Sequence, residues 1–278
     1  MSHFIVTGAS GYIGRHVVHS LANQGHRVVA MVREATQVDF SDAVTVVEGS
    51  IWDHDNELLA QYAPGATLIH LAWRDGFVHN SHAHMADLSS HFTFVETLIS
   101  LGLQKFIGLG SMHELGPVTG KVGENSVAAP ITQYGIAKNA LRLSLADLCA
   151  RNEVGYLWLR CFYILGDDAK NSSVFTKMLE LEAAGAQEMP LTLGTSKFDF
   201  IDVRELGLLI AQVSTLPDTT GLLNLGSGNV MSLRERIEQF RAENHLNIDM
   251  KFGVFPERQG IGEGCWPDLS RLAVVLGA

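Results

Sequence analysis

Short apolar runs alternate with longer segments of mixed polarity through the first 165 residues of the chain. Within the runs the apolar positions are consecutive instead of alternating, which is typical of strands that are covered on both faces. They predict strands at residues 4–7, 27–32, 45–48, 67–71, 105–109 and 155–160. Between them, helices are expected at residues 13–24, 57–62, 85–101 and 136–152. This alternation predicts an α/β fold with a doubly wound parallel sheet.

The rhythm changes after about residue 165. Residues 166–171 predict a loop, and helices and strands are then expected in turn at 174–184, 197–201, 205–214 and 221–225. The last third of the chain is richer in glycine and proline. We therefore expect one main domain over residues 1–165. Residues 166–278 should mainly form a smaller lobe, with some segments returning to the main sheet.

Composition narrows the class of protein. Of the 278 residues, 46% are hydrophobic and 18% are charged, which is enough apolar material for a large core and excludes a disordered chain. No apolar stretch reaches the roughly 20 residues of a membrane span, and the first residues lack the pattern of a secretion signal. The net charge of −10 argues against a nucleic-acid partner. Three widely spaced cysteines, Cys149, Cys161 and Cys265, predict free thiols in a reducing, cytoplasmic compartment.

A glycine-rich turn follows the first predicted strand. Gly8, Gly11 and Gly14 are spaced three residues apart, with Tyr12 and Ile13 at the start of the predicted helix. In dinucleotide-binding folds the first glycine permits the tight turn, the second lets the backbone approach the pyrophosphate, and the third allows close helix–strand packing. The free N–H groups of the helix N-terminus then attract the phosphates. We therefore expect these five residues to form the dinucleotide site of a Rossmann fold.

The ends of the next strands indicate which dinucleotide is bound. Arg33 follows the second strand, where an acidic residue would bind the ribose 2′-hydroxyl of NAD and an arginine accommodates the 2′-phosphate of NADP. Arg33 thus favours NADP, with NAD as the alternative. Ser50 and Ile51 close the third strand at the expected adenine edge. Leu71 and Ala72 end the fourth strand beside the expected path of the cofactor.

Tyr134 and Lys138 have the spacing of one helical turn, so both side chains can face one site. A nearby ammonium stabilises phenolate, and we expect it to lower the pKa of Tyr134 from about 10 towards neutrality. Tyr134 would then serve as a general acid or base. Ser111 lies just past the strand at 105–109, at the sheet edge where open parallel sheets place their sites. Its hydroxyl could hydrogen-bond the substrate oxygen that Tyr134 protonates.

As a set, these motifs resemble the extended short-chain dehydrogenase/reductases, the NAD-dependent epimerase/dehydratase family. The resemblance spans nearly the whole chain, because segments 159–166, 199–203 and 224–228 also resemble that family. It implies that Ser111, Tyr134 and Lys138 are the catalytic residues. Tyr134 would exchange a proton with the substrate, Lys138 would bind the nicotinamide ribose and Ser111 would polarise the carbonyl. Residues 1–165 would be the dinucleotide-binding domain and the smaller lobe would bind substrate.

Within the family, segments 70–73 and 158–163 look most like the nucleoside-diphosphate 4-keto-6-deoxyhexose reductases. Dehydratases carry an Asp-Glu pair where this chain has Met112-His113, which argues against dehydration. A net reductase takes up fresh NADPH in each turnover, so Arg33 favours reduction. Three alternatives remain open: an NAD-dependent sugar-nucleotide 4-epimerase, a reductase of a non-nucleotide carbonyl, and a non-catalytic, redox-sensing regulator that binds a dinucleotide.

Several other side chains are candidates for the substrate side. Trp73, His113 and Tyr163 are expected to line it. His79, His82 and His84 cluster in a segment that the resemblance places in a loop near the substrate, and their spacing is not that of a metal site, so we expect no metal. The helices expected at 85–101 and 136–152 carry more apolar residues than one buried face needs. We take the surplus to indicate a homodimer.

Overall fold

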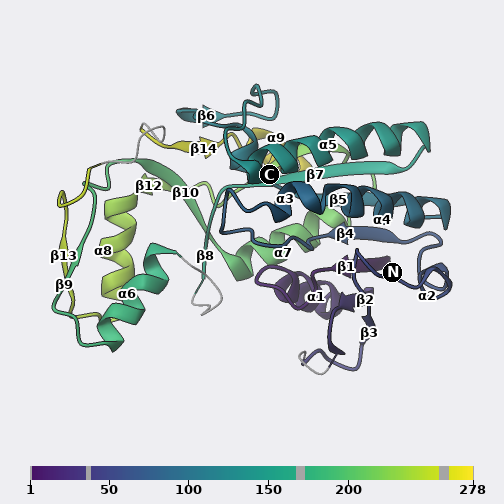
Figure 1. The fold of residues 1–278 in the computed structure, drawn as a ribbon, viewed down its shortest axis with the longest axis horizontal. Coiled ribbons are helices and arrows are strands. Elements are labelled where there is room, and N and C mark those ends of the chain that lie inside the picture. The colour runs from purple at the N-terminus through teal and green to yellow at the C-terminus, as the bar shows by residue number, and fades with distance from the viewer. Residues whose placement is uncertain (1, 36–38, 167–172, 257–262, 278) are drawn as a thin grey trace.

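A computed structural model of the chain describes residues 2–35, 39–166, 173–256 and 263–277. Its main sheet consists of β1 (His3–Thr7), β2 (Arg27–Val32), β3 (Val44–Glu48), β4 (Thr67–His70), β5 (Lys105–Ser111), β7 (Gly155–Cys161) and β11 (Gly221–Leu225). The spatial order is β11-β7-β5-β4-β1-β2-β3, and neighbouring strands are parallel (Figure 1). The predicted doubly wound parallel sheet is confirmed.

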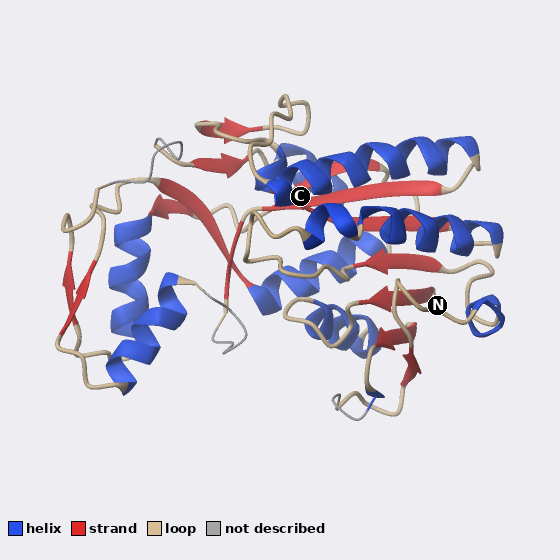
Figure 2. Cartoon of the chain, in the orientation of Figure 1, coloured by secondary structure: helices blue, strands red, loops and turns tan. Residues whose placement is uncertain are grey.

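Helices cover both faces of this sheet (Figure 2). Alternate residues of β1 point to opposite faces, so Phe4 and Val6 belong to one apolar cluster and Ile5 to the other. The first cluster lies under α1 (Gly14–Asn23), α7 (Val203–Ser214) and α9 (Ser270–Leu276). The second lies under α2 (Asn56–Ala60), α4 (Leu88–Ser100) and α5 (Gln133–Arg151). Burial on both sides explains why the strands read as continuous apolar runs.

The helix expected at 85–101 is divided in the structure. It forms α3 (Ala83–Ala86) and α4, which meet at Asp87. The Asp87 carboxylate accepts a hydrogen bond at 2.9 Å from the Arg74 guanidinium, which comes from the segment after β4. At the carboxyl edge of the sheet, β5 and β7 continue to Ser111 and Cys161, beyond their predicted ends. The two extensions place the side chains of Ser111 and Cys161 at that edge.

A smaller lobe has its own apolar core. It contains a sheet of β8 (Tyr163–Leu165), β10 (Lys197–Asp202) and β12 (Val230–Ser232), and a pair of β9 (Glu188–Pro190) and β13 (Asp249–Lys251). The helices α6 (Val174–Ala183) and α8 (Leu233–Glu243) pack there through Phe175, Met178, Ile237 and Phe240. The loop predicted at 166–171 falls, after Gly166, outside the described residues.

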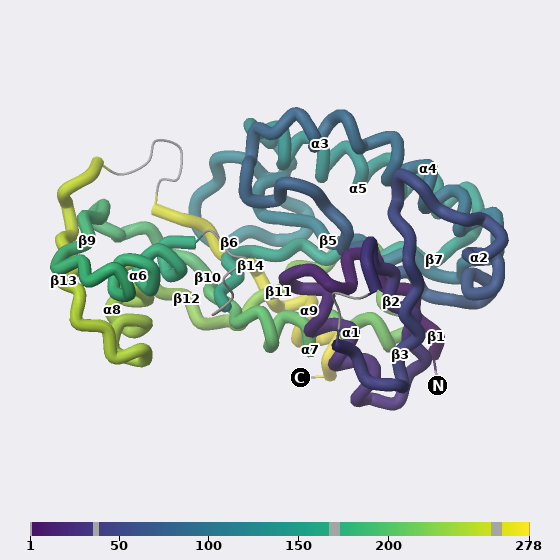
Figure 3. Tube along the Cα trace, turned by 60° about the horizontal axis from the view of Figure 1, so that its bottom comes forward, coloured from purple at the N-terminus to yellow at the C-terminus, as the bar shows by residue number. Residues whose placement is uncertain are grey.

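The C-terminal part of the chain returns to the main sheet. In Figure 3 the yellow strand β14 (Cys265–Pro267) is followed by α9, which packs on the main sheet. Strand β14 pairs with β6 (Gly120–Val122), which follows a 3-10 turn, η2 (Met112–Glu114).

The three cysteines are buried and free, as expected. No helix in the described part of the chain has the length and apolar content to cross a membrane.

Candidate active site

The glycine turn between β1 and α1 is closed tightly against the end of β4. Gly8 has a φ of +64°, and a Cβ there would lie 2.7 Å from the Ala72 backbone nitrogen. A Cβ on Gly14 would lie 2.1 Å from the Gly8 carbonyl oxygen. Ala72 N–H donates to the Thr7 hydroxyl at 3.3 Å, so the two strand ends are joined. The turn is thus held in a compact form directly before the N-terminus of α1, the kind of place where a pyrophosphate binds.

The other predicted cofactor residues border this turn. Leu71 N–H donates to the Thr7 carbonyl at 3.3 Å, and Ile13 precedes α1 and packs on the apolar cluster beneath it. The Tyr12 ring lies 6.4 Å from the ring of Phe77, and a Cβ on Gly166 would lie 2.8 Å from the Tyr12 hydroxyl. Tyr12 therefore lies between the glycine turn, the loop after β4 and the start of the smaller lobe.

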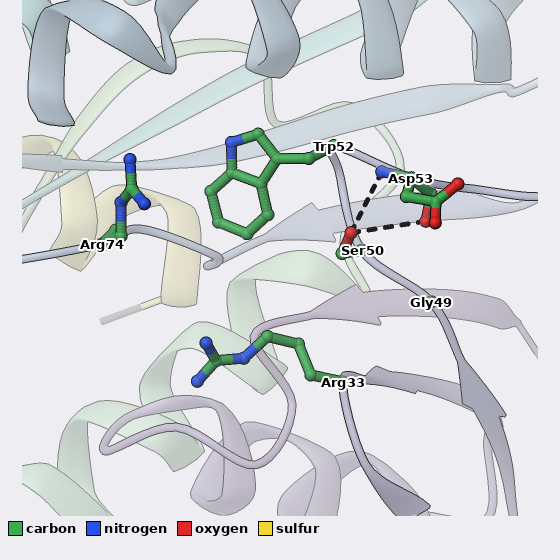
Figure 4. A pocket seen from close by; sticks show the side chains of 6 residues that line it. All are labelled: Arg33, Gly49, Ser50, Trp52, Asp53 and Arg74. Carbon is green, nitrogen blue, oxygen red and sulfur yellow. Dashed lines mark hydrogen bonds between the residues drawn. The ribbon is translucent and has the colours of Figure 1, made fainter.

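A cavity of about 370 Å³ lies beyond the ends of β2 and β3. Arg33, Gly49, Ser50, Trp52, Asp53 and Arg74 line it (Figure 4). The Arg74 guanidinium carbon lies 5.6 Å from the Trp52 ring centroid, within cation–π range. The side chain of Ile51, predicted to border the cofactor, is buried in the apolar core next to this cavity. Arg74 was not predicted, because only the folded sheet places the segment after β4 beside Arg33.

Ser111, Tyr134 and Lys138 come together at the ends of β5 and α5. Ser111 caps η2, and its hydroxyl accepts from His113 N–H at 3.3 Å and is hydrogen-bonded to Tyr134. Thr132 caps α5 by accepting from Gly135 N–H at 3.2 Å, which places Tyr134 in the first turn and Lys138 in the second. Lys138 Nζ donates to the Leu109 carbonyl at 2.8 Å. This arrangement can donate a proton to a carbonyl oxygen that approaches Tyr134.

Burial governs the proton affinities of the two groups. Burial raises the pKa of Tyr134 above its usual value, and its hydrogen bond to Ser111 only partly opposes this effect. Burial also lowers the pKa of Lys138, to about 7, while the charge of Glu114 opposes the shift. The expectation that Lys138 lowers the pKa of Tyr134 is therefore wrong in this structure. The ammonium lies 5.9 Å from the Tyr134 ring centroid and is bound to Leu109 instead.

Beneath Ser111 lies a buried carboxylate with no exposed surface, Glu114. One of its oxygens accepts from Ser111 N–H at 2.8 Å and from the Trp158 indole at 3.0 Å. The other lies 3.3 Å from Arg160 Nε and 3.8 Å from Arg142 Nε. Strands β5 and β7 and helix α5 are thus joined under the site. The sequence gives no local signal for the contacts of Glu114 with Arg142, Trp158 and Arg160, since these residues lie far from it along the chain.

Imidazole and indole rings surround Tyr134. The rings of His79, His84, His113 and Trp73 have centroids 5.8, 5.3, 5.7 and 6.0 Å from its ring. Burial, assisted by His79, lowers the pKa of His113 to about 4. Of the predicted substrate residues, Trp73 and His113 thus lie beside Tyr134. The described residues contain no group of three histidine, cysteine or acidic side chains that could hold a metal ion.

Tyr163, the third predicted substrate residue, has a different setting. Its ring packs at 4.4 Å on Phe198 and at 5.3 Å on Phe200 in the core of the smaller lobe. Strand β8, which carries Tyr163, pairs with β10, which carries both phenylalanines. The observed contacts therefore give Tyr163 a packing role within the lobe.

A chain of buried polar groups runs from the glycine turn to α4. The Thr7 hydroxyl lies 2.8 Å from His70 Nδ1, and His70 Nε2 lies 2.8 Å from His91 Nδ1. Burial lowers the pKa of His70 to about 3 and that of His91 to about 2. The two imidazoles are therefore neutral in the folded protein, and they connect β1, β4 and α4 beneath the site.

Comparisons with known proteins agree with this geometry. The sequence profile of the NAD dependent epimerase/dehydratase family matches residues 4–226. The chain is 36% identical over 267 residues to dTDP-6-deoxy-L-talose 4-dehydrogenase (NAD(+)) of Aggregatibacter actinomycetemcomitans, covering 95% of this chain and 98% of that protein. It is 23% identical over 267 residues to dTDP-6-deoxy-L-talose 4-dehydrogenase (NAD(P)(+)) of Kitasatospora kifunensis, covering 92% and 83%.

A solved structure of UDP-glucose-4-epimerase from Stenotrophomonas maltophila, with bound NAD and formylated UDP-arabinopyranose, has the same fold. Its TM-score is 0.82 at 22% identity, and the match covers 100% of this chain and 93% of that one. At this identity the likeness concerns the fold alone.

Proposed function

The chain belongs to the NAD-dependent epimerase/dehydratase family, and from this premise we propose that it reduces the 4-keto group of a nucleoside-diphosphate 4-keto-6-deoxyhexose with NADPH. The likeness to dTDP-6-deoxy-L-talose 4-dehydrogenase over nearly the full length of both chains carries the proposal. That name describes oxidation at carbon 4 of a nucleotide-linked 6-deoxyhexose. Reduction of a 4-keto-6-deoxyhexose is the same type of reaction written in the opposite direction.

The glycine turn fits a nicotinamide dinucleotide. Gly8 and Gly14 lie where a Cβ would collide with backbone, so the turn is as compact as a pyrophosphate site requires. Gly11 and the start of α1 would hold the phosphates, and Leu71 and Ala72 would border the cofactor. When bound, the reduced nicotinamide supplies a hydride to carbon 4 of the sugar.

Tyr134, Ser111 and Lys138 would complete the reduction. The raised pKa of Tyr134 keeps its phenol protonated at neutral pH, as a proton donor must be. We assign its proton to the carbonyl oxygen as the hydride adds to carbon 4, which leaves an alcohol and a phenolate. Ser111 would hydrogen-bond the same oxygen, and the Lys138 ammonium would stabilise the phenolate. Trp73 and His113, beside Tyr134, would contact the sugar.

Two arginines support a preference for NADP. Arg33 and Arg74 line one cavity with Ser50, at the edge of the sheet where the adenosine half of a dinucleotide binds. An arginine there can pair with a 2′-phosphate through two parallel hydrogen bonds. Arg33 is the residue we assign to this role.

The remaining proposals concern the whole molecule. We propose that the lobe formed mainly by residues 166–278 binds the substrate. We also propose a homodimer through α3 and α5, since Met85 and Leu143 on these helices are 43% and 55% exposed. The free, buried cysteines support a location in the reducing cytoplasm.

Turnover with defined substrates tests the function. The purified protein is mixed with dTDP- or CDP-4-keto-6-deoxyglucose, and the loss of NADPH and of NADH absorbance is followed. We expect consumption of NADPH in preference to NADH, and a fall of about 100-fold or more in kcat in Tyr134→Phe. Tyr62→Phe, which removes a hydroxyl in the turn after α2, is the matched control.

Three other outcomes would identify the alternatives. NAD that co-purifies, with interconversion of sugar epimers and no net consumption, would indicate a 4-epimerase. Turnover of simple ketones without affinity for nucleoside diphosphates would indicate a reductase of other carbonyls. Full biological activity in Tyr134→Phe would indicate a non-catalytic regulator.

A further inference from the structure

The Trp73 indole is held on two sides in the segment after β4. Its Nε1–H donates to His84 Nδ1 at 3.1 Å, and His84 Nε2 donates in turn to the Val78 carbonyl at 2.9 Å. The His91 ring stacks on the indole, with centroids 4.6 Å apart and planes 21° apart. His84 and His91 are both at least 98% buried. Such contacts leave the indole little freedom to rotate.

The face of this fixed indole meets the Lys138 ammonium. Nζ lies 3.8 Å from the Trp73 ring centroid, well inside the range of about 6 Å for a cation–π contact. The other contact of Nζ is the hydrogen bond to the Leu109 carbonyl. Glu114, the carboxylate that acts on Lys138 through space, uses its oxygens for Ser111, Trp158 and Arg160. The direct contacts of this buried ammonium are thus a carbonyl dipole and an aromatic face, and the charge of Glu114 acts on it from a distance.

We propose that Trp73 is a positioning residue for Lys138: its indole, held by His84 and His91, keeps the ammonium protonated and fixes it beside the Leu109 carbonyl, 5.9 Å from the Tyr134 ring centroid. The inference rests on the proposed roles of Tyr134 and Lys138. It goes beyond them because Trp73 would also control the protonation of Lys138, in addition to contacting the substrate. It also explains the role of His84, one of three clustered histidines, as the residue that holds the Trp73 indole in place.

The other groups around Lys138 do not remove the need for this contact. Among the described residues, the titratable groups that act on it or are acted on by it lie on four elements: Glu114, Cys161, His70 and His91. Burial raises the pKa of the Cys161 thiol to about 12, so Cys161 is neutral at pH 7. His70 and His91 are neutral as well, since burial lowers their pKa values far below 7. Glu114 is the charged neighbour, and it is engaged elsewhere.

Magnitude decides whether the contact matters. Burial lowers the pKa of Lys138 to about 7 even though the charge of Glu114 opposes the shift, and at that pKa half of the molecules would lack the ammonium at neutral pH. A cation–π contact away from water corresponds to about one to one and a half pKa units in favour of the charged form. That shift converts Lys138 from half charged to almost fully charged at pH 7. The indole would therefore set the upper end of the active pH range.

Direct titration of Lys138 tests the inference without turnover. The apoprotein is prepared with lysine labelled with carbon-13 at the ε position, and the Lys138 signal is assigned with Lys138→Met. In Trp73→Leu we expect the pKa read from this signal to fall by about one unit or more. In Trp73→Phe, which keeps a weaker aromatic face, the pKa of Lys138 should lie between the values for wild type and Trp73→Leu. Trp266→Leu, in β14, is the matched control and should leave the Lys138 titration unchanged.

Kinetics supply a second readout. A one-unit fall in the pKa of Lys138 makes the loss of kcat/KM in Trp73→Leu grow with pH, from none at low pH to about tenfold at high pH. A loss of substrate contact alone would lower kcat/KM equally at all pH values. An unchanged lysine titration in Trp73→Leu and Trp73→Phe would overturn the inference. If the titration shifts but Tyr134→Phe keeps full turnover, the proposed function fails and the Trp73–Lys138 contact stands.

Discussion

The His70–His91 pair makes the protein sensitive to acid in a way that one substitution can test. Both imidazoles are buried and neutral, with pKa values lowered by burial to about 3 and about 2 from an ordinary value of 6.5. In the unfolded chain both would bind a proton below about pH 6.5. The unfolded state therefore takes up more protons than the folded state between about pH 6.5 and 3.

The sign and size follow from this difference. The stabilisation is fully present above pH 6.5 and is lost as the pH falls towards the folded pKa values. Each such histidine lowers the free energy of unfolding by about 1.4 kcal/mol for every pH unit in the middle of this window. His113, with a pKa lowered to about 4, adds to the same slope above pH 4. His91→Gln should reduce by one the number of protons that are taken up on unfolding. The slope of the free energy of unfolding against pH should then fall by about 1.4 kcal/mol per pH unit.

Urea unfolding at a series of pH values from 7.5 to 5 measures this slope for wild type and His91→Gln. The comparison uses the slope, so a constant loss of stability from the lost ring packing does not affect it. His19→Gln replaces an exposed histidine on α1 and is the control, for which we expect the wild-type slope. Equal slopes in His91→Gln and wild type would refute the reasoning, because His91 would then bind its proton equally in both states.

Three further substitutions test the site and its supports. Arg33→Ala should raise the KM for NADPH by about 10- to 100-fold and leave that for NADH nearly unchanged, because the charged hydrogen bonds to the 2′-phosphate are lost; an equal effect on both cofactors would argue against contact with the 2′-phosphate. Gly14→Ala places a Cβ 2.1 Å from the Gly8 carbonyl and should weaken NADPH binding by tenfold or more, whereas Gly123→Ala, with open space around it, should bind normally in the same fluorescence titration. Glu114→Gln leaves Arg160 buried without its carboxylate and should lower the free energy of unfolding by about 3–5 kcal/mol, measured by denaturant titration; a loss below 1 kcal/mol would show that water reaches Arg160.

The sequence allowed the sheet to be predicted because its strands are buried on both faces. The run at residues 28–32, for example, is apolar throughout, which is typical of a covered parallel strand. The helices around them were found from the spacing of apolar residues. In contrast, α8 was missed, because its sequence is largely charged and only Ile237 and Phe240 face the lobe core. The break at Asp87 was also missed; there the carboxylate binds Arg74, which lies thirteen residues away along the chain.

The same distinction separates the parts of the site. Gly8, Gly14, Tyr134 and Lys138 were recognised because each belongs to a local pattern whose spacing carries its own physical reason. Glu114 and Arg74 were not recognised as parts of the site, because their partners come from other strands and helices. Arg160 is 46 residues from Glu114, and Arg33 is on a different strand from Arg74. Contacts between residues on different strands can be predicted only when the strand order and register are known.

Tyr134 shows how a correct local pattern can lead to the wrong electrostatic conclusion. The spacing to Lys138 places both residues on one face of α5, and from that alone a lowered phenol pKa follows. Folding adds two effects that the spacing does not contain: burial of the phenol, which raises its pKa, and capture of the ammonium by Leu109 and Trp73. A phenol that keeps its proton at neutral pH is suited to protonate an alkoxide formed by hydride addition, and poorly suited to deprotonate an alcohol. The direction of this shift therefore matches the proton-donor role that we propose for Tyr134.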